Sequence, residues 1–551
     1  MKPMNKEKTI SMTRLVPLAM AALALLLTAS AYAATPGIQG TAFTLTARAA
    51  FLTQPDGQAI YSWGYGCTGN TPGSAKFMPS AISNTFCNDM QVPGPTLIVT
   101  EGVPFTVTLA NSLPTGAGNT SILFPGLQLQ SVSGGVAGLL TAEAAPNGSV
   151  TYTLVANSPG TRAYYSGTQG DLQVEMGMYG AVVVLPANVP SVCTTGLPLT
   201  KPGGNAAAQS HWKETDFRLA DSAYDDANTC YDREYLFQFS EIDPRIHRQA
   251  EEQLATIANC TPSETNVCPT SLNVATEPYH PAYYMINGRS MPDNMDPNYA
   301  VQYPHQPYNG NPHMHPGELT LLRVLGQGRW QHPFHEHGNH VRILGRDGNL
   351  ILTPDGQALA GPLLFTTTTT PGLAMDGIFY WSGKGLNWDA YGHHPSSNDP
   401  NAVLPCTPDA NGYNTGDPTA INYFEWCQDH NKPVEKAPFG DVSGGGPVTL
   451  PDPNILTNGA WFSGSPYLGP DATTRATFGT CTGANTLTGC GTTGTTPPSG
   501  TIANNPSSEA GFAFMWHSHN EREITTNNIF PGGMLMMMLV DSREFVIDES
   551  F

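Results

Sequence analysis

Two short histidine motifs could bind a metal in this chain of 551 residues. One is His332-Pro-Phe-His-Glu-His-Gly-Asn-His340 and the other is Trp516-His-Ser-His519, and each contains a His-x-His pair. In an extended strand, residues i and i+2 point to the same face, so each pair directs two imidazoles the same way. Imidazole is a good ligand for copper, zinc, iron and nickel. If the two strands are neighbours, the spacing predicts a metal centre made of His335, His337, His517 and His519.

The same four histidines also have a structural interpretation, as a hydrogen-bonded polar core without a metal. We favour the metal, because one ion would satisfy four buried polar side chains that are otherwise costly to bury. A third pair, His313-Met-His315, is either a surface or turn pair or an accessory copper or substrate-metal site. We interpret His393-His394 as surface residues of a loop. The methionines at 534 and 536–538 are expected to fill a core, because methionine adapts to irregular packing; the alternative is a cuprous-ion site, which would require their thioethers to converge.

The elements around these motifs are predicted to be strands. Apolar or alternating runs, typical of strands, occur at 95–102, 104–110, 149–154, 179–185, 281–288, 318–325, 363–370 and 377–381. A helical run is found at 244–257. The chain has 57 Gly and 48 Pro with 12% charged residues, which suits a turn-rich β protein. We therefore expect an all-β fold of the sandwich or barrel type.

An internal repeat indicates two β-domains. Residues 160–167 followed by 178–184 resemble residues 511–519 followed by 533–540, with a similar gap between the halves of each copy. We predict a first domain at 41–190, a Pro/Gly-rich and then acidic linker at 191–230, and a second domain at 231–551. Residues 385–510 are rich in Gly, Thr, Pro, Asn and Asp, and predict a long loop-rich insertion pinned by disulfide bonds.

The N-terminus and the cysteines predict an exported protein. Residues 1–33 combine a basic leader, an apolar run and a small-residue cleavage site, as in a secretion signal, so we expect a periplasmic or extracellular location. No stretch predicts a membrane span. The ten cysteines include no CxxC and predict disulfides; neighbours along the chain could pair, although sequence alone leaves the connectivity open. A net charge of −20 argues against nucleic acid as a partner.

Several motifs resemble those of multicopper oxidases. Residues 332–338 are similar to the HPxHxHG motif of that family, and His517-Ser-His519 with Gly533-Met534 is similar to its HCHxxxHxxxGM motif. Four further segments also resemble sequences of that family: residues 93–102, 120–122, 286–290 and 370–372. The resemblance implies two cupredoxin-like Greek-key β-sandwich domains with copper as the cofactor. It adds His332 as a fifth candidate ligand, because this histidine matches a ligand of the family's type 1 copper; the alternative is a structural histidine bonded to the backbone.

The sequence departs from the family at three places. Ser518 stands where the family has the type 1 cysteine, and the second type 1 histidine would fall at or near Glu523. Residues 123–126 (Leu-Phe-Pro-Gly) and 165–167 (Tyr-Ser-Gly) stand where the first domain of the family carries histidine pairs. Four of the eight cluster histidines are therefore missing. The resemblance implies a centre of one ion, or two with help from a carboxylate of Glu336, Glu521 or Glu523.

These observations predict an exported, copper-binding oxidoreductase. The resemblance implies a phenolic or metal-ion donor and dioxygen as acceptor. The alternative is a non-catalytic copper-binding or structural protein that kept the fold and part of the site. Two-domain relatives tend to form trimers with the cluster between subunits, but a first domain without ligands makes a monomer equally credible. The oligomeric state therefore stays open.

Overall fold

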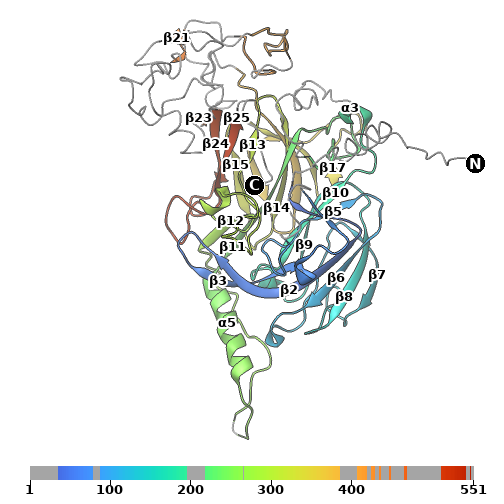
Figure 1. Cartoon of the computed structure of the whole chain (residues 1–551), viewed down its shortest axis with the longest axis vertical. Helices are drawn as coiled ribbons and strands as arrows, with labels where there is room; N and C mark the ends of the chain where they lie inside the picture. The colour runs from blue at the N-terminus through green and yellow to red at the C-terminus, as the bar shows by residue number, and fades with distance from the viewer. Residues whose placement is uncertain are drawn as a thin grey trace, which may run out of the picture.

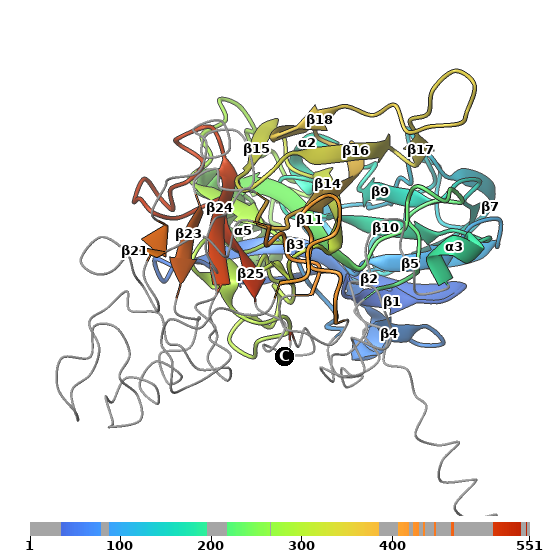
Figure 2. The same cartoon turned by 90° about the horizontal axis from the view of Figure 1, so that it is seen from above.

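The computed structural model describes residues 35–78, 87–194, 218–264, 266–384, 406–417, 423–428, 434–435, 446–447, 464–467, 511–541 and 547. Over these residues, strands far outnumber helices, and four main sheets form two β-sandwiches. Figures 1 and 2 show the blue and teal strands of the first sandwich beside the green, yellow and red strands of the second. The predicted all-β class and the cupredoxin-like architecture are confirmed.

The first sandwich packs two five-stranded sheets face to face. One sheet has the order β4 (Lys76–Met78), β1 (Gly37–Gln39), β5 (Leu97–Thr100), β10 (Tyr179–Leu185) and β9 (Gly160–Tyr165). The other has the order β3 (Ala59–Cys67), β2 (Ala42–Thr53), β6 (Phe105–Asn111), β8 (Ser149–Val155) and β7 (Gln128–Gly134). Strand β6 alternates buried and half-buried residues, so one face enters the core and the other does not. The runs predicted at 95–102, 104–110, 149–154 and 179–185 are all strands.

The second sandwich is larger and carries both histidine motifs. Its first sheet runs β12 (Tyr283–Ile286), β11 (Arg233–Ile242), β14 (Leu319–Gly326), β20 (Ala374–Tyr380), β16 (Val341–Arg346) and β17 (Asn349–Leu350), with β18 (Leu363–Leu364) beside β16. Its second sheet runs β13 (His313–Met314), β25 (Leu535–Asp541), β24 (Gly511–Ser518), β15 (His332–Glu336) and β19 (Thr366–Thr369), with β23 (Gly464–Tyr467) beside β24. A short pair, β21 (Val434–Glu435) and β22 (Gly446–Pro447), lies in the predicted insertion.

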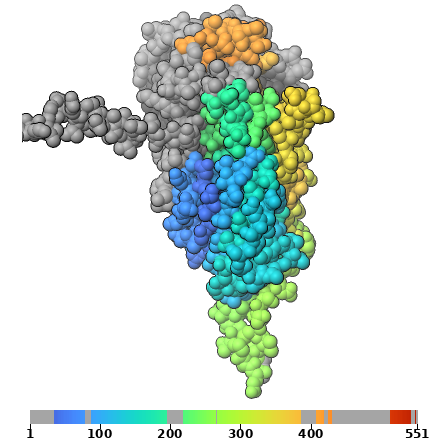
Figure 3. Space-filling view, turned by 90° about the vertical axis from the view of Figure 1, so that its right-hand side faces the viewer, coloured from blue at the N-terminus to red at the C-terminus, as the bar shows by residue number. Residues whose placement is uncertain are grey.

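The helices are few among the described residues, and the longest was predicted. Helix α5 (Pro244–Asn259) begins with proline at its first turn, and the Asp243 side chain accepts a hydrogen bond from the Arg245 N–H, as an N-cap does. Ile246, Ala250 and Leu254 recur every four residues and are buried in the core of the first sandwich. Figure 3 shows the light-green segment that contains α5 extending beyond the blue and teal strands. The short helices are α2 (Gly170–Gln173) and α3 (Ser191–Thr194).

A buried polar network joins the two sandwiches. The Asp376 carboxylate, on β20, accepts hydrogen bonds from the N–H and the hydroxyl of Thr161, on β9, at 3.0 and 2.5 Å. It also accepts one from the Tyr224 hydroxyl at 2.7 Å, and Arg323 lies 3.5 Å away. Arg323 in turn pairs with Glu234 at 2.6 Å. Because these groups are buried and mutually satisfied, the network fixes the two sandwiches against each other.

Four of the predicted disulfides are present, and they join neighbours along the chain. These are Cys67–Cys87, Cys193–Cys230, Cys260–Cys268 and Cys406–Cys427, the last within the predicted insertion. Cys481, Cys490 and the predicted signal at 1–33 lie outside the described residues. No helix in the described part of the chain has the length and apolar character that crossing a membrane requires. The domain boundaries given above stay predictions.

Candidate metal centre

The two histidine motifs lie on neighbouring antiparallel strands. In the pairing of β15 with β24, His335 is directly opposite His517, and Phe334 is opposite Ser518. Directly opposed residues of an antiparallel pair project from the same face of the sheet. The register therefore brings the two His-x-His pairs together across one face, as their spacing predicted.

Three of the histidines converge closely enough to share one ion. One ring nitrogen each of His335, His337 and His517 lies within 4.8 Å of the other two, and all three side chains are buried. The Nε2 atoms of His337 and His517 are 3.3 Å apart. Two nitrogens that each lie about 2.0 Å from a tetrahedral ion are separated by roughly this distance. The residues present therefore fit a metal ion such as copper.

His519 forms the outer edge of this cluster. Its ring centre lies 5.0 Å from that of His335 and 5.5 Å from that of His517, and its side chain is exposed. The Phe365 ring, which is 53% exposed, lies 5.6 Å from the His335 ring on another side. The buried three-histidine part thus opens to solvent at an edge that carries a fourth imidazole and an aromatic ring.

The surroundings of His335 and His517 keep these two imidazoles neutral and oriented. Burial, together with the neighbouring imidazoles of His517 and His519, lowers the pKa of His335 to about 4, and burial also lowers the pKa of His517. The Nδ1 of His517 lies 2.7 Å from the Ser518 carbonyl oxygen, and the Nδ1 of His335 lies 2.9 Å from the Thr366 hydroxyl. Such contacts fix a ring so that Nε2 presents its lone pair, which is the arrangement of metal-binding histidines.

His332 does not join the cluster. It lies three positions before His335, so its side chain projects from the opposite face of β15, toward the core. Its Nδ1 is 2.9 Å from a Glu523 oxygen and its Nε2 is 2.9 Å from a Glu241 oxygen. Burial alone would lower the pKa of His332, but the hydrogen bonds to Glu241 and Glu523 outweigh burial and raise it to about 9. His332 is therefore placed as an imidazolium between two carboxylates.

The predicted help from carboxylates is wrong for Glu336 and Glu523. Glu336 lies between two cluster histidines in sequence, but alternation turns it into the core, where it is opposite Trp516. One of its oxygens accepts a hydrogen bond from Thr367 at 2.8 Å, the other has no partner among the described residues, and burial raises the Glu336 pKa to about 8. Glu523 is bonded to His332. Glu521 is exposed near the cluster.

The other candidate ligands serve different roles. The Nδ1 atoms of His313 and His315 face Asp541, at 2.7 Å from its carboxylate and 3.0 Å from its backbone oxygen, so this pair is not part of the cluster. Met534, Met536 and Met538 alternate into the core of the second sandwich, as expected for packing. His393 and His394 lie outside the described residues. Sequence reasoning missed Glu241, whose only signal is an acidic residue inside a strand.

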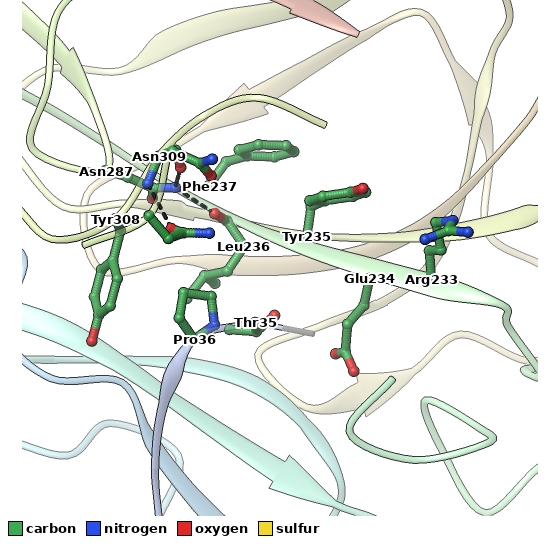
Figure 4. Close-up of a pocket in the computed structure, with 11 residues that line it drawn as sticks. Thr35, Pro36, Arg233, Glu234, Tyr235, Leu236, Phe237, Asn287, Tyr308 and Asn309 are labelled. Atoms are coloured by element: carbon green, nitrogen blue, oxygen red, sulfur yellow. Dashed lines mark hydrogen bonds between the residues drawn. The ribbon is translucent and has the colours of Figure 1, made fainter. Parts of the chain in front are cut away.

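The first domain offers no histidine to the centre. The positions where the family carries two further histidine pairs, Leu123 and Tyr165–Gly167, line an open pocket of about 320 Å³ together with Gly328, Arg329 and Pro371. Another cavity, of about 20 Å³, lies beside β11 where Pro36, Asn287 and Tyr308 meet (Figure 4). That volume holds about one water molecule and no substrate. Among these described sites, the histidine cluster alone has the donors for a metal.

One family model matches part of the chain, and several solved structures are similar to it. Residues 72–189 match the family model described as multicopper oxidase. The chain matches none of the curated proteins with which it was compared. Similar solved structures include the multicopper oxidase mgLAC, with 14% identity, 92% of this chain and 87% of that chain covered, and a TM-score of 0.42. The blue copper oxidase from Nitrosomonas europaea has 13% identity, coverage of 90% and 85%, and a TM-score of 0.41. A copper nitrite reductase from Nitrosomonas europaea has 17% identity, coverage of 62% and 84%, and a TM-score of 0.36.

Two cupredoxin-like sandwiches in one chain define the class of this protein. Residues 72–189, within the first of them, match the multicopper oxidase family model, which confirms the resemblance to that superfamily. The chain departs from the motifs of that superfamily, because Ser518 stands at the type 1 cysteine position and the first domain lacks the histidine pairs. The residues at the type 1 position do not fit a blue copper, since that site requires a cysteine thiolate.

Proposed function

We propose that this protein is an exported copper-binding oxidoreductase. Its centre consists of His335, His337 and His517, with His519 at the open edge. The observation that carries the proposal is the convergence of three buried ring nitrogens within 4.8 Å on neighbouring strands. Copper bound there would supply one-electron redox chemistry. Export is supported by the four disulfides, which persist in oxidising compartments.

The imidazoles of His335 and His517 are uncharged and already oriented to bind a cation. His335 and His517 are neutral at physiological pH, because their pKa values are lowered, so no proton has to leave before they bind copper. The contacts to the Thr366 hydroxyl and the Ser518 carbonyl hold the rings in place. The site is thus largely formed in advance, which reduces the ordering that binding would require.

The electron donor reaches the centre from its exposed edge. In the family, electrons enter through the type 1 copper, but here the corresponding residues form buried hydrogen bonds among themselves. The exposed imidazole of His519 and the half-exposed ring of Phe365 border the opening. A small phenol could stack on such an edge, and a low-valent metal ion could approach it directly. We assign dioxygen as the acceptor, in line with the family.

Oxygen uptake tests this function. Copper-loaded protein is mixed with a phenol, with Mn(II) and with Fe(II), and uptake is compared with that of His337→Ala/His519→Ala. A double variant at two histidines outside the centre, His280→Ala/His305→Ala, is the matched control. We expect uptake with at least one donor in wild type and control, and a loss of tenfold or more in the cluster variant. Stoichiometric copper without uptake from any donor would overturn the oxidase assignment.

A further inference from the structure

A second polar group lies directly beneath the histidine cluster, on the core side of the same two strands. It consists of Glu241, His332, Ser518 and Glu523, which we call the clamp. All four side chains are 2% exposed or less. The residues come from β11, β15, β24 and the segment that follows β24, so they are brought together only by the fold.

The glutamate at each end of the clamp is fully satisfied. The Glu241 oxygen that does not face His332 accepts hydrogen bonds from the backbone N–H groups of Arg329 and Trp330 at 2.6 and 2.8 Å. The Glu523 oxygen that does not face His332 accepts one from the Asn520 side-chain amide at 2.9 Å. A buried network in which every acceptor is satisfied is rigid and specifies one arrangement, whereas a partly satisfied one does not.

The clamp ties the two ligand strands to each other. One Glu523 oxygen lies 2.9 Å from the His332 Nδ1, on β15, and accepts a hydrogen bond from the Ser518 hydroxyl, on β24, at 2.5 Å. Ser518 lies between the cluster residues His517 and His519 in sequence, and its carbonyl faces the His517 Nδ1. Holding the Ser518 side chain therefore also holds the backbone from which two cluster imidazoles project.

The clamp also reaches the first sandwich. The Tyr279 hydroxyl lies 3.3 Å from Glu241 and donates to the Glu175 carboxylate at 2.7 Å. The other Glu175 oxygen accepts a hydrogen bond from the Asp243 N–H at 2.7 Å, at the start of α5. Glu175 follows α2 in the first domain, so the Tyr279 hydroxyl lies between a carboxylate of the first domain and the Glu241 carboxylate of the clamp.

We propose that Glu241, His332, Ser518 and Glu523 form a metal-free positioning unit that sets the cluster histidines for copper. The inference rests on the proposed function for the identity of the ion, but the hydrogen bonds that position the histidines do not depend on which ion binds. The Ser518 and Glu523 side chains bond to each other and Glu523 to His332, on the core side of the strands, so they act on the cluster through the position of β24. Loss of such supporting contacts generally weakens metal binding by 10- to 100-fold.

The test uses Ser518→Ala and Glu523→Gln in the full chain. Ser121→Ala is the matched control, because Ser121 is an equally buried serine with a hydroxyl partner in the first domain, at 2.9 Å from Thr168. Two quantities are measured: the histidine ring resonances of the metal-free protein by NMR, and Cu(II) affinity by competition with a chromophoric chelator. We expect both variants to shift the His517 and His519 resonances and to weaken copper binding about tenfold or more, and the control to do neither.

The two measurements separate the two proposals. If both variants shift the ring resonances but wild type binds no copper, the positioning unit is retained and the proposed function is contradicted. Ring resonances and copper affinity within twofold of wild type in both variants would overturn the positioning unit, whatever the protein oxidises. The same shift and the same weakening of copper binding in Ser121→Ala would also overturn the positioning unit, since replacing any buried serine would then have this effect.

Discussion

The Oε2 atom of Glu523 lies 2.9 Å from the Nδ1 atom of His332, although 191 residues separate the two in sequence. In the multicopper oxidase motifs that these segments resemble, His332 matches a ligand of the type 1 copper, and a second histidine ligand would fall at or near Glu523. Here they bond to each other, and Ser518, at the position of the third ligand, bonds to the same glutamate oxygen. These positions therefore form a buried hydrogen-bonded group on the core face of the strands, while the histidines on the other face converge.

Stability should fall as pH rises through the titration of His332. Its pKa is about 9 in the folded protein, against about 6.5 in the unfolded chain, so its contribution is complete below pH 6.5 and is lost as pH rises toward 9. A shift of this size corresponds to about 3 kcal/mol. The His332 ring is surrounded by Glu241, Glu523, Ser518 and the ring of Phe239. Urea unfolding at pH 6.5, 7.5 and 9 measures the loss. His332→Gln should remove this part of the pH dependence, and an identical slope in both proteins would contradict the assignment.

Blue copper chemistry should return only with two substitutions. Wild type should lack the intense visible band of a copper thiolate, because position 518 has a hydroxyl. Ser518→Cys alone should also lack it, because Glu523 still occupies one nitrogen of His332. Ser518→Cys/Glu523→His supplies one thiolate and two imidazoles and should show the band after copper loading. Absorption and EPR spectra decide this. A band in wild type, or none in the double variant, would show that these positions do not correspond to the type 1 site.

Replacing Glu336 by leucine should stabilise the fold. The Glu336 carboxyl is fully buried, opposite Trp516 in the strand register, and one of its oxygens has no partner in the described part of the chain. Burial raises its pKa to about 8. Removing a half-satisfied polar group from an apolar core is worth about 1–3 kcal/mol. Thermal unfolding of Glu336→Leu should therefore occur at a higher temperature than in wild type, and Glu336→Gln should show no comparable gain. A lower melting temperature in the leucine variant would mean that the carboxyl has a partner outside the contacts described above.

The contact between domains should depend on Asp376. Asp376→Ala removes the acceptor for Thr161 and Tyr224 and leaves Arg323 with less compensation. Breaking a buried charged network of this kind costs about 3–5 kcal/mol. Urea unfolding should show that loss, while Asp355→Ala, at an exposed turn, should leave stability close to that of wild type. Equal stability of the two variants would show that the Asp376 network does not hold the two sandwiches together.

Local sequence patterns predicted much of the fold, and they predicted that the cluster histidines share one face of each strand. They did not predict which residue bonds to His332. The alternation in β6 and the cap and apolar spacing of α5 are local signals, and both elements form as expected. The His-x-His spacing predicted two imidazoles on one face of each strand, and the same alternation places His332 and Glu336 on the other face. The partner of His332 could not be predicted, because Glu241 reaches it from β11, 91 residues away, through a sheet pairing that no local pattern encodes.

Copper binding to the cluster tests the central claim most directly. The metal-free protein is titrated with Cu(II), and bound copper per chain is measured in wild type, in His337→Ala/His519→Ala and in the control His280→Ala/His305→Ala. We predict one tightly bound copper in wild type and control, with an EPR spectrum of nitrogen ligation and no blue band, and at least a hundredfold weaker binding in the cluster variant. No copper in wild type, or unchanged binding in the cluster variant, would contradict the account.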